Sequence, residues 1–158
     1  NFTEDASNII KLDFKSIKEY ILENYTKEDI LYVVTGSPYF FSAGILIAKK
    51  LPKEQVKIIN NVSSKLYMQE RLLINDAQID TFSWHGRAYI DLTKFLTNSY
   101  TFILCDKLTI SKLKEATKYL RPKDIEVTIG YKLGYDDEVI KQIDLFDFSY
   151  ESFNIDLP

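Results

Sequence analysis

The chain has 158 residues, of which 46% are hydrophobic and 27% are charged, and its formal net charge is −3. This length can bury the core of one domain or of two small ones. The acidic balance argues against a nucleic-acid partner, which usually requires a basic surface. Because no apolar run is long enough to cross a bilayer, we expect no membrane partner, and we expect a cytoplasmic location.

Two scarce residue types narrow the chemistry further. A single cysteine, Cys105, excludes a disulfide within the chain, and a single histidine, His85, argues against a histidine-based metal site. We therefore expect no bound metal. The chain opens at Asn1 without a methionine, and we expect that the beginning of the natural protein is missing.

Hydrophobic periodicity predicts alternating helices and strands in the first half of the chain. A helical stripe over residues 14–25 follows Asp13, which can cap it. Short unbroken apolar runs that end at a turn are typical of buried parallel strands, because helices cover both faces of such a sheet. The remaining elements of this half are then a strand over 30–34, a helix over 39–50, a strand over 56–59 and a helix over 65–73.

The alternation continues in the second half and predicts a second α/β domain. Its strands are expected over 79–83, 100–106 and 125–131, its helices over 91–96 and 110–120, and weaker strands over 138–143 and 153–157. Lys112, Lys114 and Lys118 are interpreted as a solvated helix face. The domain boundaries that we predict are 1–78 for the N-terminal α/β domain and 79–158 for the C-terminal one.

The most informative stretch is Thr35-Gly36-Ser37-Pro38, which directly follows the first predicted strand. Loops at the carboxyl ends of strands in an open sheet bind small molecules, because their backbone N–H groups are available. Gly36 lets the backbone approach a ligand closely, and Pro38 fixes the turn into the next helix. Taken alone, however, the stretch is better explained as a helix entry.

Three further stretches give this loop a context: Asn61-Val62-Ser63-Ser64, Trp84-His85-Gly86-Arg87 and Leu133-Gly134-Tyr135. Their order and spacing resemble the tetrapyrrole methylases. Within them the chain is most similar to the cobalt-precorrin-7 C5-methyltransferase branch, the methylase half of precorrin-6Y C5,15-methyltransferase. That branch carries Gly-Asp-Pro where this chain has Gly36-Ser37-Pro38, and the Gly-rich strand and loop that open the family are absent. The resemblance covers residues 30–138.

The resemblance implies a fold class of α/β, with two small α/β domains of the tetrapyrrole methylase type and a cleft between them. It implies S-adenosylmethionine as methyl donor, S-adenosylhomocysteine as product, and a corrinoid substrate, a cobalt-precorrin methylated at C5 in cobalamin biosynthesis. Homodimers are common for this architecture, and a decarboxylating methyltransferase, fused or separate, is the implied partner.

The site residues follow from the same resemblance. The cofactor would be bound by Gly36, Ser37, Pro38, Phe40, Phe41, Ser63, Ser64, Cys105 and Asp106. His85 would orient the ring or carry its proton, since an imidazole titrates near neutrality, and Arg87 would bind ring carboxylates through its guanidinium.

Each of these residues also has a purely structural interpretation. His85 is equally well explained as a loop histidine bonded to backbone, Ser63 or Ser64 can cap the following helix, and Cys105 suits a small buried position. Phe40 and Phe41 can fill a core instead of walling a pocket. Lys65 and Arg71 could form a basic rim with Arg87 that binds ring carboxylates, but each is better explained as a solvated helix charge.

Two other functions remain open beside a cobalt-precorrin methyltransferase. One is a non-catalytic tetrapyrrole- or nucleoside-binding module of the same fold. The other is methylation of ribosomal RNA, which the acidic charge balance disfavours.

Overall fold

The computed structural model describes residues 9–75, 79–84, 100–105, 108–118 and 125–149, and the account below concerns these residues. The chain divides into two compact units, Asn1–Ser63 (the N-terminal unit) and Ser64–Pro158 (the C-terminal unit), and each is described by itself. The division falls earlier in the chain than the predicted boundary after residue 78. The predicted elements over 91–96 and 153–157 lie outside the described residues.

The N-terminal unit begins with helix α1, Phe14–Asn24, at the predicted place. Asp13 caps it, because its Oδ1 accepts hydrogen bonds from the backbone N–H groups of Lys15 (2.9 Å) and Ser16 (3.1 Å). The Ser16 hydroxyl donates to the same carboxyl group at 2.7 Å and is the main reason why the pKa of Asp13 lies below its ordinary value. The predicted helix and its cap are confirmed.

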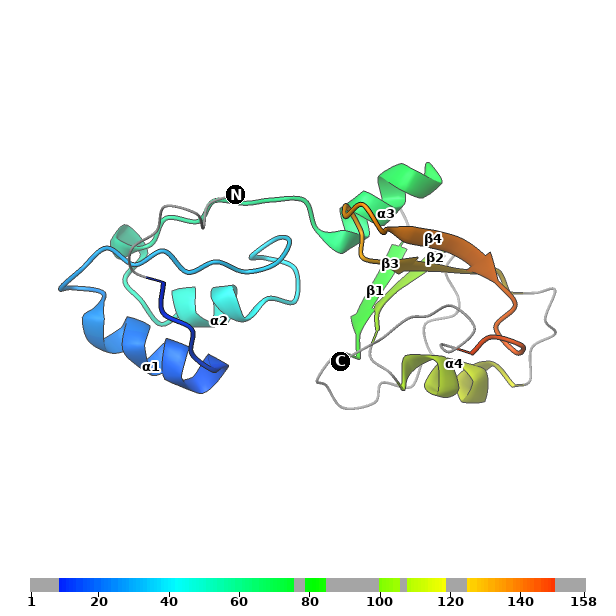
Figure 1. The fold of residues 1–158 in the computed structure, drawn as a ribbon, viewed down its shortest axis with the longest axis horizontal. Coiled ribbons are helices and arrows are strands. Elements are labelled where there is room, and N and C mark those ends of the chain that lie inside the picture. Colours follow the sequence, from blue (N-terminus) through cyan, green and yellow to red (C-terminus); the bar gives the residue numbers. More distant parts are fainter. Residues whose placement is uncertain (1–8, 76–78, 85–99, 106–107, 119–124, 150–158) are drawn as a thin grey trace. The chain divides into compact units, whose positions relative to one another are not determined.

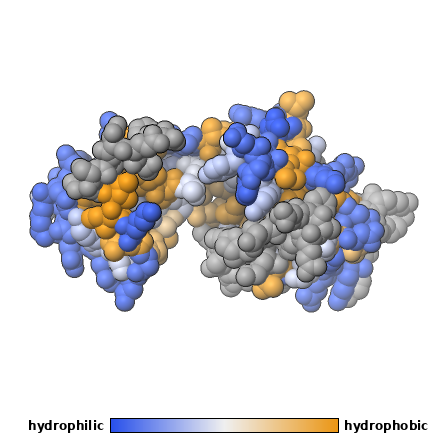
Figure 2. Space-filling view, viewed as in Figure 1, coloured by the Kyte–Doolittle hydropathy of each residue, from blue (hydrophilic) through white to orange (hydrophobic). Residues whose placement is uncertain are grey.

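Residues 30–34 and 56–59 of this unit are not strands, although both were predicted to be. Side-chain exposure alternates along the first run: Leu31 and Val33 are 76% and 74% exposed, whereas Tyr32 and Val34 lie against Gly44. Such alternation indicates an extended backbone. The strand prediction is wrong because a strand also needs a hydrogen-bonded neighbour, and no described residue supplies one to either run. Apolar side chains thus remain on the surface of this unit (Figure 2).

Two short helices complete the N-terminal unit. Helix α2, Ala43–Ala48, starts four residues later than predicted, and the 3₁₀ helix η1 spans Lys53–Gln55. The late start has a local cause: Phe41 has a φ of +50°, which a right-handed helix cannot contain. The helix therefore begins only after Ser42, whose hydroxyl accepts a hydrogen bond from the Gly44 N–H at 3.1 Å.

The C-terminal unit contains three of the predicted strands and a fourth that the sequence indicated weakly. Strand β1, Ile79–Ser83, pairs in parallel with β2, Tyr100–Leu104, and β3, Val127–Tyr131, pairs antiparallel with β4, Val139–Ile143. Its helices among the described residues are α3, Ser64–Leu72, and α4, Thr109–Thr117. All six elements overlap their predicted ranges, so the α/β character of this unit is confirmed.

The two helices cover opposite faces of the β3–β4 hairpin (Figure 1). Val127, Ile129 and Tyr131 pack on the cluster of Trp84, Ile110, Leu113, Leu145 and Phe148, which includes the inner face of α4. Gly130 points the other way, because successive residues of a strand face opposite sides. A methyl group there would lie only 2.5 Å from Sδ of Met68 on α3, so a larger residue at this position would have to displace the Met68 side chain.

Lys114 corrects one expectation about α4. Its Nζ donates hydrogen bonds to the carbonyl oxygens of Phe146 (2.8 Å) and Phe148 (3.1 Å). The sequence suggested that Lys114 belongs to a solvated helix face, and this interpretation is wrong. Lys114 ties α4 to the segment that follows β4.

Candidate functional site

The loops after the two extended runs of the N-terminal unit come together. The Ser37 hydroxyl donates a hydrogen bond to Oδ1 of Asn60 at 2.7 Å. Gly36 lies beside Val62, since a methyl group at Gly36 would be 3.7 Å from the Val62 carbonyl oxygen. The structure thus joins the first predicted motif to the residues that lead into the second. We call residues 35–38 and 60–63 the paired loops.

Gly36 and Ser37 have distinct parts in this arrangement. Gly36 has a φ of +67°, a left-handed conformation that side chains with a Cβ rarely adopt. Ser37 is 6% exposed, and its oxygen also accepts a hydrogen bond from the Tyr39 N–H at 3.2 Å. The hydroxyl is therefore engaged twice within the protein, once as donor and once as acceptor.

Asn60 is the residue that sequence reasoning missed. It follows the second apolar run as Ser37 follows the first, and this parallel placement was the available signal. The signal was weak, because an asparagine at the end of an apolar run is ordinary in a turn. The Ser37–Asn60 hydrogen bond and the approach of Gly36 to Val62 show that the two loops meet.

Pro38, Phe40 and Phe41 follow the first loop. The backbone turns here, with the Phe40 N–H donating to the Ser37 carbonyl oxygen at 3.1 Å. The rings of Phe40 and Phe41 meet edge to face, with centroids 4.8 Å apart and planes at 67°. Both side chains are half-buried, so the pair is neither a closed core nor a fully solvated surface. A positive φ at a bulky residue such as Phe41 is an energetic cost that surrounding structure must offset.

Of the remaining predicted site residues, Ser63 belongs to the second of the paired loops. Ser64 is the first residue of α3 and belongs to the C-terminal unit, while Ser63 ends the N-terminal unit. Cys105 is exposed and its Sγ donates to the Ile103 carbonyl oxygen at 3.3 Å, so its interpretation as a buried filler is wrong. His85, Arg87 and Asp106 lie outside the described residues.

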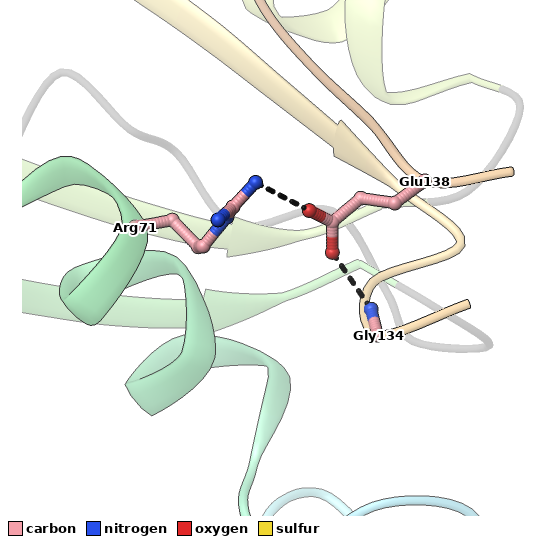
Figure 3. Close-up of polar contacts among 3 residues, drawn as sticks. All are labelled: Arg71, Gly134 and Glu138. Carbon is pink, nitrogen blue, oxygen red and sulfur yellow. Dashed lines mark hydrogen bonds and ion pairs between the residues drawn. The ribbon is translucent and has the colours of Figure 1, made fainter. Parts of the chain in front are cut away.

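The Leu133-Gly134-Tyr135 stretch forms a tight turn that Glu138 closes. Gly134 has a φ of +79°, and its N–H donates to Oε2 of Glu138 at 2.7 Å. Nη2 of Arg71 lies 3.0 Å from Oε1 of the same carboxylate (Figure 3). The guanidinium of Arg71 is thus paired with a carboxylate of this chain, and this ion pair competes with the predicted role of Arg71 in a basic rim.

Tyr67 adds a third group to this carboxylate. The hydrogen bonds that the Gly134 N–H and the Tyr67 hydroxyl donate to Glu138 lower the pKa of this carboxyl group. The same hydrogen bond to Glu138 raises the pKa of Tyr67. Since Tyr67 and Arg71 both belong to α3, Glu138 fastens this helix to the turn before β4.

Two features can be checked directly in the described part of the chain, a metal-binding cluster and a membrane-spanning helix. Among those residues, no group of three or more histidine, cysteine, aspartate or glutamate side chains could hold a metal ion. Within the same ranges, no helix has the length and apolar character needed to cross a membrane.

Comparison with known protein families places the paired loops and the Gly134 turn in one context. Residues 4–148 match the family described as Tetrapyrrole (Corrin/Porphyrin) Methylases. The chain belongs to the tetrapyrrole methylase family. Searches of the curated proteins and of the solved structures each give no match.

Membership explains the joint presence of the four stretches, because one tetrapyrrole methylase domain spans all of them. Methylases of this family are generally S-adenosylmethionine-dependent and act in tetrapyrrole pathways.

Proposed function

We propose that the chain is an S-adenosylmethionine-dependent C-methyltransferase, and that its substrate is a cobalt-precorrin, cobalt-precorrin-7, methylated at C5 during cobalamin biosynthesis. The observation that carries the methyltransferase proposal is the family match over residues 4–148. The narrower substrate rests on the sequence resemblance of the four stretches taken together in their order.

The paired loops fit the chemistry of the proposed cofactor. The backbone N–H groups of Gly36 and Asn61 make no hydrogen bond within the described ranges, and neither loop carries a charged side chain. Such donors suit the carboxylate of the methionyl part of S-adenosylmethionine. The half-buried rings of Phe40 and Phe41 suit the adenine or the sulfonium of the cofactor. An aromatic face attracts a cation such as the sulfonium.

The cofactor supplies an electrophilic methyl group for in-line displacement by a ring carbon. The protein's main contribution to such a reaction is to hold the two reactants in line, which can account for several kcal/mol of the barrier. The Ser37–Asn60 bond serves that purpose by holding two ligand-facing loops at a fixed separation. We assign carboxylate binding on the corrinoid to Arg87 and handling of the ring proton to His85.

A non-catalytic tetrapyrrole- or nucleoside-binding module of the same fold is the second candidate. One observation favours it: residues 30–34 and 56–59, which lead into the paired loops, have no strand neighbour among the described residues. Methyl transfer demands alignment that is more exact than binding demands, and loops on unpaired segments are less firmly held.

Titration calorimetry with S-adenosylhomocysteine tests the proposal. We expect saturable binding to the wild-type chain, and weaker binding when Ser63 and Ser64 are both replaced by Leu. Asp13→Asn, which keeps a side-chain acceptor at the N-cap of α1 and alters no predicted site residue, is the surface control and should bind as the wild type does. Absence of binding to the wild-type chain would contradict the proposed function.

A further inference from the structure

The Ser37–Asn60 hydrogen bond fixes which end of the Asn60 side chain faces outward. An asparagine amide has one acceptor, Oδ1, and one donor group, Nδ2. Oδ1 accepts a hydrogen bond from the Ser37 hydroxyl at 2.7 Å, and Ser37 itself is buried. Asn60 is exposed, and its Nδ2 group makes no hydrogen bond to any residue that the structure describes. The donor end of the amide is thus the end that remains for a ligand.

The neighbouring groups have the same donor character. Oδ1 of Asn61 is occupied as well, since it accepts the Val62 N–H at 2.8 Å. The backbone N–H groups of Gly36 and Asn61 make no hydrogen bond within the described ranges. The acceptors of both asparagine side chains are therefore engaged inside the protein, while N–H donors remain. A group that only accepts hydrogen bonds, such as a carboxylate, matches this arrangement.

We propose that Asn60 is a ligand-binding residue whose Nδ2 group donates a hydrogen bond to a carboxylate of the bound ligand. Ser37 is the positioning residue that holds the amide in this orientation. The proposal rests on the proposed function for the identity of the ligand, and two sources of carboxylate follow from it. One is the amino-acid part of the cofactor, and the other is a side chain of the tetrapyrrole.

Asn60→Asp isolates the donor from the rest of the loop. The new carboxylate can still accept a hydrogen bond from the Ser37 hydroxyl, so the connection between the loops is retained. An aspartate side chain cannot donate a hydrogen bond, however, and its charge repels a ligand carboxylate. Gln55→Glu is the matched control, because it makes the same amide-to-carboxylate change at an exposed position of η1, outside the paired loops. Far-ultraviolet circular dichroism should show equal thermal unfolding for both variants and the wild type.

Calorimetry with three probes distinguishes the sources of the carboxylate. S-adenosylhomocysteine carries the amino-acid carboxylate, 5′-methylthioadenosine lacks it, and uroporphyrin carries only tetrapyrrole carboxylates. If Asn60 binds the cofactor, Asn60→Asp weakens the affinity for S-adenosylhomocysteine by about 10-fold to 100-fold, as expected for a hydrogen bond to a charged group, and leaves 5′-methylthioadenosine unchanged. If it binds the substrate, only the affinity for uroporphyrin falls.

Two results would overturn the proposal while leaving the proposed function intact. The first is wild-type affinity of Asn60→Asp for both S-adenosylhomocysteine and uroporphyrin. The second is an equal loss in Asn60→Asp and Gln55→Glu, which would assign the effect to added charge instead of a lost donor. Absence of S-adenosylhomocysteine and uroporphyrin binding by the wild-type chain would overturn both proposals together.

Discussion

Replacing Gly130 with alanine is expected to destabilise the C-terminal unit by displacing the Met68 and Leu133 side chains. The added methyl group would lie 2.5 Å from Met68 Sδ and 2.9 Å from Leu133 Cδ2. Non-bonded heavy atoms favour about 3.5–4.0 Å, so the Met68 side chain must move by roughly 1 Å. Met68 is buried and has little room to do so. Overpacking of this kind costs about 1–3 kcal/mol.

Trp84 provides the assay for this variant. It is the one tryptophan of the chain and lies fully buried in the core of the C-terminal unit, so its fluorescence in urea reports the unfolding of that unit. With a denaturant dependence of about 2 kcal/mol per molar, the midpoint should fall by roughly 0.5–1.5 M. In a Met68→Ala background the same change should lose part of its effect, because the nearer of the two colliding side chains is gone while that of Leu133 remains.

Gly44→Ala is the control for Gly130→Ala. Its methyl group would meet Ser42 Oγ at 3.4 Å and Val34 Cγ1 at 3.5 Å, which is nearly ordinary contact, and Gly44 lies in the N-terminal unit. The Trp84 transition should therefore stay where it is in the wild type. An unchanged midpoint for Gly130→Ala itself would refute the packing argument.

Three further predictions concern a turn, a lysine and a carboxylate. Gly36→Ala should lower the free energy of unfolding by about 1–2 kcal/mol through its left-handed backbone, and Gly36→Asn by less, as thermal unfolding by circular dichroism will show. Lys114→Met should destabilise the C-terminal unit by about 1–3 kcal/mol in the Trp84 assay, because two carbonyl oxygens lose their donor, whereas exposed Glu115→Gln should not. Because the folded state lowers the pKa of Glu138, its stabilising contribution is present above the ordinary value of 4.5 and is lost as pH falls below it, so Glu138→Gln should flatten the acid side of the stability profile.

Each of these has a clear contrary result. Equal losses from Gly36→Ala and Gly36→Asn would show that backbone strain is not the cause. Wild-type stability of Lys114→Met would mean that water replaces the lysine at no cost. An acid limb that is identical in Glu138→Gln and the wild type would show that this carboxylate is not linked to folding.

Local signals in the sequence predicted much of the fold. A capping aspartate before an amphipathic stripe located α1, and strand–helix alternation located all six described elements of the C-terminal unit. These features depend on neighbouring residues, whose spacing a sequence displays directly. The late start of α2 escaped prediction because it depends on the left-handed backbone of Phe41, which no composition rule signals.

Non-local features were the harder part. Residues 30–34 have the apolar content of a strand, but strand formation requires a partner, and periodicity does not reveal whether one is present. The family resemblance singled out Ser37, but not Asn60, which lies 23 residues further along the chain. Lys114 looked solvated because its carbonyl acceptors follow β4, far from it in sequence.

The most direct test of the central claim is a methyl-transfer assay with S-adenosylmethionine and cobalt-precorrin-7, in which mass spectrometry measures the mass of the corrinoid product. With a deuterated methyl donor, the account predicts a product that gains one labelled methyl group only when the protein is present, together with release of S-adenosylhomocysteine. An unlabelled corrinoid after incubation with a protein that binds both reactants would contradict it.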